Sequence, residues 1–227
     1  MLLWIETKRS AAAPPAACAG PAKPMRTARR MKKVMPWILA MIWLATVGGG
    51  MGVLLVYDFT PGKDSGFVPK VWPAGLPRAA DRPTLVMFAH PKCPCTRASI
   101  GELAVLMARC QGLVNAQVVF FRPQGTPEDW DHTDLWRSAA EIPGVRVQSD
   151  EGGREARNFR ATASGYTVLY DTRGRLIFSG GITDSRGHAG DNPGRSAIVD
   201  LLHHRPTANT RTPTFGCSLL NPTSETF

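Results

Sequence analysis

The sequence predicts an α/β fold in which helices sandwich a mixed sheet, preceded by one N-terminal transmembrane helix. Two observations predict this arrangement. Residues 34–57 contain no charged side chain, and a helix of that length crosses about 30 Å of hydrocarbon. Beyond residue 82, short apolar runs typical of buried strands alternate with segments of helical period, and the last two runs form a hairpin.

The exported part of the chain is expected to have the order β-α-β-α-β-α-β-β-α. Strands are predicted at 84–90, 116–123 and 145–150, and helices at 95–110, 127–142, 152–159 and 194–204. The clearest hairpin is "YTVLYDTRGRLIFSGG", residues 166–181, which has Gly174 at its turn. Alternation followed by a hairpin and a helix favours a mixed sheet over a purely parallel one.

The positive charge of the chain lies before the apolar segment. The net charge is +9, and residues 1–33 account for +7 of it, with eight Lys/Arg against the single acid Glu6. The folded part is therefore close to neutral. A nucleic-acid groove needs a basic patch on the domain itself, so no nucleic-acid partner is expected.

Charge and hydropathy together predict five segments. They are a basic, largely disordered cytoplasmic segment 1–33, a transmembrane helix 34–57 in the lipid bilayer, a linker 58–82, a domain 83–205 and a C-terminal tail 206–227. The positive-inside rule keeps the N-terminus in the cytoplasm and exports the domain. A cleaved signal peptide is the alternative, and the true start at Met25 or Met31 remains open.

Two cysteines, Cys93 and Cys95, stand with one residue between them where the helix predicted at 95–110 begins. A thiol at a helix N-terminus has a lowered pKa and a larger reactive thiolate fraction. Cys93, in the loop, is expected to be the accessible nucleophile, and Cys95 the resolving thiol. Lys92 would favour the thiolate as well, and Pro94 stiffens the turn.

This arrangement resembles the thioredoxin superfamily over about residues 80–204. A strand leads to a cysteine pair that opens the first helix, and Phe88 stands five residues before Cys93, as in that family. The segments "HPKCPCTRASIGEL", "ATASGYTVLYD" and "FSGGITDSRGHAGDNPG" look like those of membrane-anchored thioredoxin-like proteins often labelled RedB. The resemblance implies a thioredoxin-like redox protein on the periplasmic side of a bacterial inner membrane. Its expected partners are protein thiols or disulfides, and no cofactor is expected.

The sequence departs from the thioredoxin pattern at two positions. The family's second cysteine would fall at Thr96, whereas here it is Cys95, and a disulfide closed over one residue is expected to be strained and easily reduced. The family's usual cis-proline before the penultimate strand is replaced by Tyr166. We therefore expect a more oxidising couple and an altered grip on substrate chains.

Two other functions stay open at this point. Cys93 and Cys95 are soft ligands that could hold copper(I) together with His90 or, from the late loop, His188. That alternative is a copper(I)-binding thioredoxin-fold carrier for membrane-enzyme assembly. The third possibility is a non-catalytic anchored interaction domain.

The remaining exported cysteines have separate expectations. Cys217 lies beyond the last helix, and the tail is long enough either to bring it back as a third thiol that resolves Cys93 or to leave it free. Cys110 lies on the apolar face of its helix and is expected to be buried and inert. The glycine-rich segment 180–194 lacks the Lys-Ser/Thr pair of a phosphate loop and is expected to line one side of the site.

Overall fold

The computed structural model describes residues 26–62 and 66–220, with side chains from residue 34 onward. The chain divides into two compact units, Met1–Gly50 and Met51–Phe227. Helix α1 covers Arg26–Phe59, so it begins within the segment expected to be disordered, while residues 1–25 lie outside the described part.

Helix α1 carries the apolar segment recognised in the sequence. Its stretch Val34–Phe59 is long and apolar enough to cross a membrane, which matches the expected span 34–57 within two residues at its end. Side chains along it are exposed, among them Trp37, Trp43 and Leu54. A helix of this kind near an N-terminus serves as a membrane anchor or a signal sequence.

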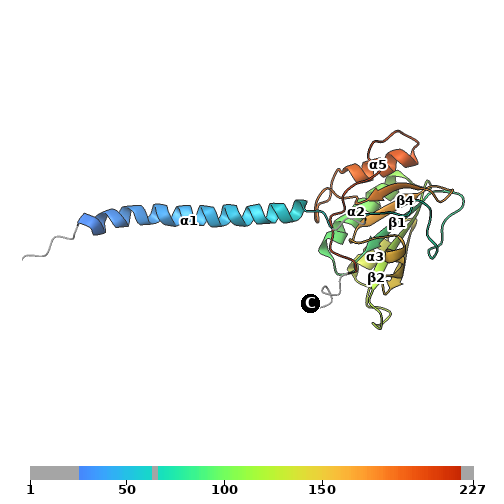
Figure 1. The fold of residues 1–227 in the computed structure, drawn as a ribbon, viewed down its shortest axis with the longest axis horizontal. Coiled ribbons are helices and arrows are strands. Elements are labelled where there is room, and N and C mark those ends of the chain that lie inside the picture. The colour runs from blue at the N-terminus through green and yellow to red at the C-terminus, as the bar shows by residue number, and fades with distance from the viewer. Residues whose placement is uncertain (1–25, 63–65, 221–227) are drawn as a thin grey trace, which may run out of the picture. The chain divides into compact units, whose positions relative to one another are not determined.

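The second unit is built on a five-stranded mixed sheet of order β3-β2-β1-β4-β5 (Figure 1). The strands are β1 Thr84–Ala89, β2 Asn115–Arg122, β3 Val145–Glu151, β4 Tyr166–Tyr170 and β5 Leu176–Gly180. Strands β1, β2 and β3 are parallel, whereas β4 runs antiparallel to both β1 and β5. The helices are α2 Pro94–Arg109, α3 Asp134–Ala140, α4 Arg154–Asn158 and α5 Pro193–Leu202. The predicted order and the mixed sheet are confirmed.

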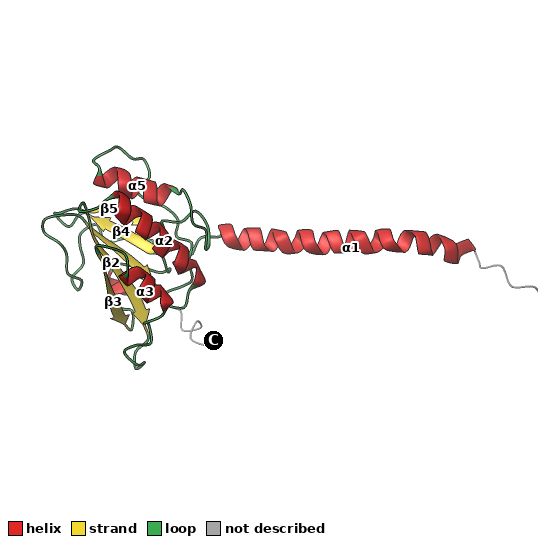
Figure 2. Cartoon of the chain, turned by 180° about the vertical axis from the view of Figure 1, so that it is seen from behind, coloured by secondary structure: helices red, strands yellow, loops and turns green. Residues whose placement is uncertain are grey.

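Strand β1 shows how the sheet separates two cores. Leu85 and Met87 belong to the first core, a cluster shared with α2, α3 and α5, which lie together on one face of the sheet (Figure 2). Val86 and Phe88 belong to the second core, a cluster on the opposite face that includes residues of α4 and of the C-terminal tail. Alternate residues of a strand point to opposite faces, so a continuous apolar run indicates a strand covered on both sides.

Helix α3 is shorter than the sequence predicted. The helix expected at 127–142 begins only at Asp134, with Thr133 as its N-cap. Before it the chain forms turns, in which the Trp130 N–H donates to the Pro127 carbonyl at 3.1 Å. Further backbone bonds, from the His132 N–H to the Asp129 carbonyl and from the Thr133 N–H to the Asp131 carbonyl, keep this segment in turns and account for the late start. The hydroxyl of Thr133 donates to the Pro91 carbonyl at 3.1 Å and so ties this loop to the turn before α2.

The packing of α2 generates a test of the fold. Leu103 is fully buried in the first core, whereas Val105 on the same helix is 38% exposed. The change Leu103→Ala should lower the free energy of unfolding by about 2–5 kcal/mol, because it leaves a cavity that the sheet cannot fill. The matched change Val105→Ala should cost less than about 1 kcal/mol. Urea unfolding of the purified chain, followed by near-UV circular dichroism, measures both, and equal costs would contradict this packing.

Candidate active site: three converging cysteines

Cys93 occupies the N-cap position of α2, and Pro94 is the first helical residue. The Cys93 backbone is extended, with φ −91° and ψ 116°, and its side chain makes no capping hydrogen bond. The Thr96 N–H donates to the Cys93 carbonyl at 3.1 Å and closes the first turn. The thiol is therefore held at the positive end of the helix dipole and is not used to cap it.

The C-terminal tail folds back onto the segment that precedes β4. The Ser164 N–H donates to the Cys217 carbonyl at 2.8 Å, and the Leu219 N–H donates to the Thr162 carbonyl at 3.0 Å. Between them, Ala163 and Ser218 form an antiparallel bridge. Leu219 is 1% exposed within the second core, so both backbone pairing and apolar burial anchor the tail.

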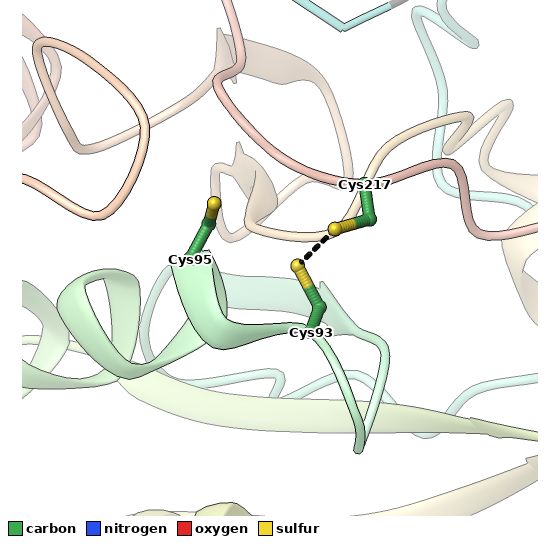
Figure 3. Close-up of side chains that lie close together, drawn as sticks. All are labelled: Cys93, Cys95 and Cys217. Atoms are coloured by element: carbon green, nitrogen blue, oxygen red, sulfur yellow. Dashed lines mark hydrogen bonds between the residues drawn. The ribbon is translucent and has the colours of Figure 1, made fainter. Parts of the chain in front are cut away.

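The tail brings Cys217 directly to Cys93. Their Sγ atoms lie 2.8 Å apart and share a hydrogen bond (Figure 3). Cys95 completes the group, since the Sγ atoms of the three cysteines lie within 4.8 Å of one another. None of the three forms a disulfide. The sequence left open whether the tail returns Cys217 to the other cysteines or leaves it free, and in the structure the tail returns it.

The expectation that Cys93 would be openly accessible is wrong. Cys93 is only 2% exposed, and Cys217 of the tail lies against it with its sulfur 2.8 Å away. The sulfur instead borders a cavity of about 470 Å³ that Lys92, Trp130 and Cys217 also line. A larger cavity of about 890 Å³ lies elsewhere and has neither cysteine nor histidine in its lining.

The hydrogen bond between Cys93 and Cys217 sets the protonation of the pair. It lowers the pKa of Cys93 to about 5, against the opposing effect of burial and with help from Thr96. The same bond, followed by burial, raises the pKa of Cys217, so Cys217 keeps the proton. Burial and the neighbouring Cys93 charge raise the pKa of Cys95. The site thus combines one thiolate with two thiols.

Ser164 connects the three segments that form the site, and the sequence did not single it out. Its hydroxyl oxygen accepts the His90 N–H at 2.8 Å and lies 2.6 Å from the Thr96 hydroxyl. Its own N–H holds the carbonyl of Cys217. The residue stands within the quoted segment "ATASGYTVLYD", but its role depends on a tail more than fifty residues away, which no local pattern reveals.

Arg186 is a second residue that sequence reasoning missed. Its guanidinium donates to the Gly216 carbonyl at 2.9 Å. It also opposes the rise in the pKa of both Cys95 and Cys217. Arg186 belongs to the glycine-rich segment 180–194, so the expectation that this loop lines the site is confirmed.

Lys92 and His90 contribute to the turn and to the cavity wall. The Lys92 ammonium lies 4.1 Å from the centroid of the Trp130 ring, and the Lys92 N–H donates to His90 Nδ1 at 3.2 Å. The His90 ring stacks on Phe121 at a centroid distance of 5.9 Å. The lowered pKa of Cys93 is due to Cys217 and Thr96, while Lys92 is engaged by an aromatic face.

The remaining predicted residues lie at the edge of the site or away from it. Tyr166 is the first residue of β4, pairs with Phe88 and is buried. The described residues contain no cis peptide bond. His188 is not part of the group of closely placed ligand atoms, which within the described chain consists of the three cysteines. Cys110 is fully buried in the first core, as expected.

The tail contact can be tested at Gly216. A Cβ at this position would collide with the carbonyl oxygen of Ser164, so Gly216→Ala should push the tail off the site. A destabilisation of about 1.4 kcal/mol would raise the open population, and with it the alkylation rate of Cys93, about tenfold. Gly101→Ala, on α2 with open space around it, is the matched control. Mass spectrometry of the Cys93 peptide gives the rates, and unchanged alkylation in Gly216→Ala would refute the covering role of the tail.

The protonation of Cys93 predicts a pH titration. Because its pKa is about 5 instead of the ordinary 9.0, the reduced native chain should gain one thiolate as the pH rises through about 5. Removal of the hydrogen-bond partner in Cys217→Ala should move this midpoint upward, whereas Cys110→Ala should leave it in place. Thiolate absorbance, taken as the difference from Cys93→Ser, follows the titration. A native midpoint near 9 would show that the pair is not coupled in this way.

Comparisons with known proteins bear on the fold. Neither a protein-family profile nor a curated protein matches the chain. Among solved structures, an uncharacterized conserved protein of Geobacillus kaustophilus aligns with a TM-score of 0.50 and 22% identity, covering 72% of this chain and 94% of its own. A hypothetical protein of Sinorhizobium meliloti 1021 aligns with a TM-score of 0.49 and 21% identity, over 71% of this chain and 94% of its own.

One similar structure has a named activity. It is a secreted disulfide oxidoreductase of Mycobacterium tuberculosis, described as homologous to Escherichia coli DsbE. Its TM-score is 0.41 and its identity 13%, over 62% of this chain and 96% of its own. A likeness at this level does not carry that activity over to this chain. The strand order and the mixed sheet are those of the thioredoxin-like fold predicted from the sequence, with a close Cys93/Cys95 pair at the start of the first domain helix.

Proposed function

We propose that this chain is a membrane-anchored thiol–disulfide oxidoreductase whose nucleophile is Cys93. One observation carries the proposal: a cysteine at the N-terminus of α2 has a lowered pKa and a protonated second thiol 2.8 Å from its sulfur. Thiol–disulfide exchange needs an attacking thiolate, and a nearby second thiol can then resolve the mixed disulfide. The thioredoxin-like fold, shared with known disulfide oxidoreductases, supports it as analogy.

The exchange balances in two steps. The Cys93 thiolate attacks one sulfur of a partner disulfide, so a bond forms between Cys93 and the partner while the partner's own S–S bond breaks and releases a thiolate. A second cysteine of this chain, once deprotonated, then attacks the Cys93 sulfur and releases the second partner thiolate. Two electrons pass to the partner, and this chain keeps a disulfide. The reverse sequence oxidises a partner dithiol.

Cys217 is better placed than Cys95 to resolve the mixed disulfide. It already contacts the Cys93 sulfur, whereas Cys95 lies two positions further along the start of α2. A disulfide ring closed over one residue also opposes good disulfide geometry. Cys217 therefore resolves Cys93 in this proposal, and Cys95 is the slower alternative.

We infer the side of the membrane on which the domain lies from α1 and from the positive charge of the segment before it. The apolar stretch Val34–Phe59 anchors the chain, and the basic residues of segment 1–33 keep the N-terminus in the cytoplasm. The domain then lies on the outer, periplasmic face of a bacterial inner membrane, where disulfides persist. This placement and the partner class, protein thiols or disulfides, agree with the resemblance to membrane-anchored thioredoxin-like proteins of the RedB type.

Trapping of mixed disulfides tests the function and the resolving role together. The variant Cys217→Ser should accumulate mixed disulfides between Cys93 and a model disulfide protein, because the second step is slowed. Cys95→Ser should accumulate fewer, and Cys110→Ser should match the parent chain. Non-reducing electrophoresis and mass spectrometry identify the adducts.

The controls separate two kinds of failure. Adducts of the same yield in Cys93→Ser would disprove the role of Cys93 as the nucleophile. Accumulation in Cys95→Ser but not in Cys217→Ser would return the resolving role to Cys95 and keep the oxidoreductase function. A chain that yields no adduct in any variant would contradict the function itself.

A further inference from the structure

We infer that Cys93, Cys95 and Cys217 together form a binding site for one copper(I) ion when all three are reduced. The site goes beyond the exchange reaction and differs from the set considered from the sequence, because a tail cysteine takes the place of a histidine. Its basis is the convergence of three Sγ atoms, from the start of α2 and from the tail, within 4.8 Å of one another (Figure 3).

The spacing of the sulfurs suits a shared ion. Metal–thiolate bonds of about 2.3 Å at trigonal angles place the ligand sulfurs about 4.0 Å apart. The group's upper limit of 4.8 Å is compatible with this value. Cys93 and Cys217, now 2.8 Å apart, would have to separate by about 1.2 Å to reach that spacing. Such a shift lies within the reach of a side-chain rotation on the tail.

The number and kind of ligands favour copper(I). Thiolates are soft ligands that select copper(I) and zinc, and structural zinc sites are almost always four-coordinate. Within the described part of the chain, the group contains three cysteines and neither histidine nor carboxylate as a fourth member. A three-sulfur set thus suits a soft monovalent ion better than tetrahedral zinc.

The surroundings compensate the charge that such a centre would carry. Three thiolates around one monovalent cation leave a negative centre, which needs nearby positive charge or hydrogen-bond donors. The Arg186 guanidinium acts on both Cys95 and Cys217. The positive end of the α2 dipole lies at the same place, since Cys93 is the N-cap residue of that helix.

The structure also provides an entry path and a support for the third ligand. Cys93 and Cys217 both line the 470 Å³ cavity, which gives an ion an approach to this side of the site. The hydrogen bond from the Ser164 N–H to the Cys217 carbonyl fixes the backbone of the tail ligand. Binding displaces the protons of the thiols. Formation of the Cys93–Cys217 disulfide removes two of the three ligands, so oxidation and copper binding exclude each other.

Competition for copper(I) tests the site on the full-length chain in detergent. The reduced chain is titrated against the copper(I) complex of bathocuproine disulfonate, and we expect one copper per chain. Cys217→Ser should bind more than about 100-fold more weakly, since loss of even an outer-shell partner costs about 10- to 100-fold. Cys110→Ser and His188→Ala should bind like the parent chain. X-ray absorption should show three sulfur neighbours.

Several results would overturn the inference. They are no copper bound by the reduced parent chain, parent-like affinity in Cys217→Ser, or a nitrogen neighbour lost in His188→Ala. Oxidation of the parent chain with diamide tests the same ligands without a mutation: it should abolish binding, and reduction should restore it. Copper retained after oxidation would also refute the site. These readings measure binding alone, so they are independent of the outcome of mixed-disulfide trapping.

Discussion

The pairing of the C-terminal tail with residues 162–164 is the constraint on which the site depends. Two backbone hydrogen bonds, from Ser164 and from Leu219, set the register of the tail, and the buried Leu219 side chain anchors it. Register in a strand-like pairing determines which side each residue faces. A slip of one residue would turn Cys217 away from Cys93, and the close thiol pair would no longer exist.

That pairing supplies the main cause of the lowered pKa of Cys93 at the start of α2. A helix N-terminus alone lowers the pKa of a cysteine, but here the largest effect on Cys93 comes from Cys217. The two thiols share one proton and hold it on the tail side. Nucleophile and covering segment are therefore linked: a movement that uncovers Cys93 also removes the hydrogen bond that stabilises its thiolate. When the Cys93 sulfur becomes exposed, the fraction of it that is thiolate therefore falls.

The sequence predicted what depends on local pattern and on period. The strand run 84–90, the hairpin 166–181 and the cysteine pair at a helix start all appear in the structure. The late start of α3 was missed because local turns in 127–133 compete with helix formation. The roles of Ser164 and Arg186 could not be predicted, since both residues act on a tail that is remote in sequence. Periodicity in the sequence predicts the helices and strands, but it does not predict which loops contact one another in the fold.

The position of the tail gives the one-residue spacing of "KCPC" a different structural explanation. Cys93 and Cys95 need not be each other's covalent partners, because the Cys217 sulfur lies 2.8 Å from that of Cys93. The close spacing instead keeps a third thiol within 4.8 Å of the reacting pair. In the proposed exchange, oxidation joins Cys93 to Cys217 in a disulfide, whereas reduction returns the three sulfurs as a cluster that could share one ion.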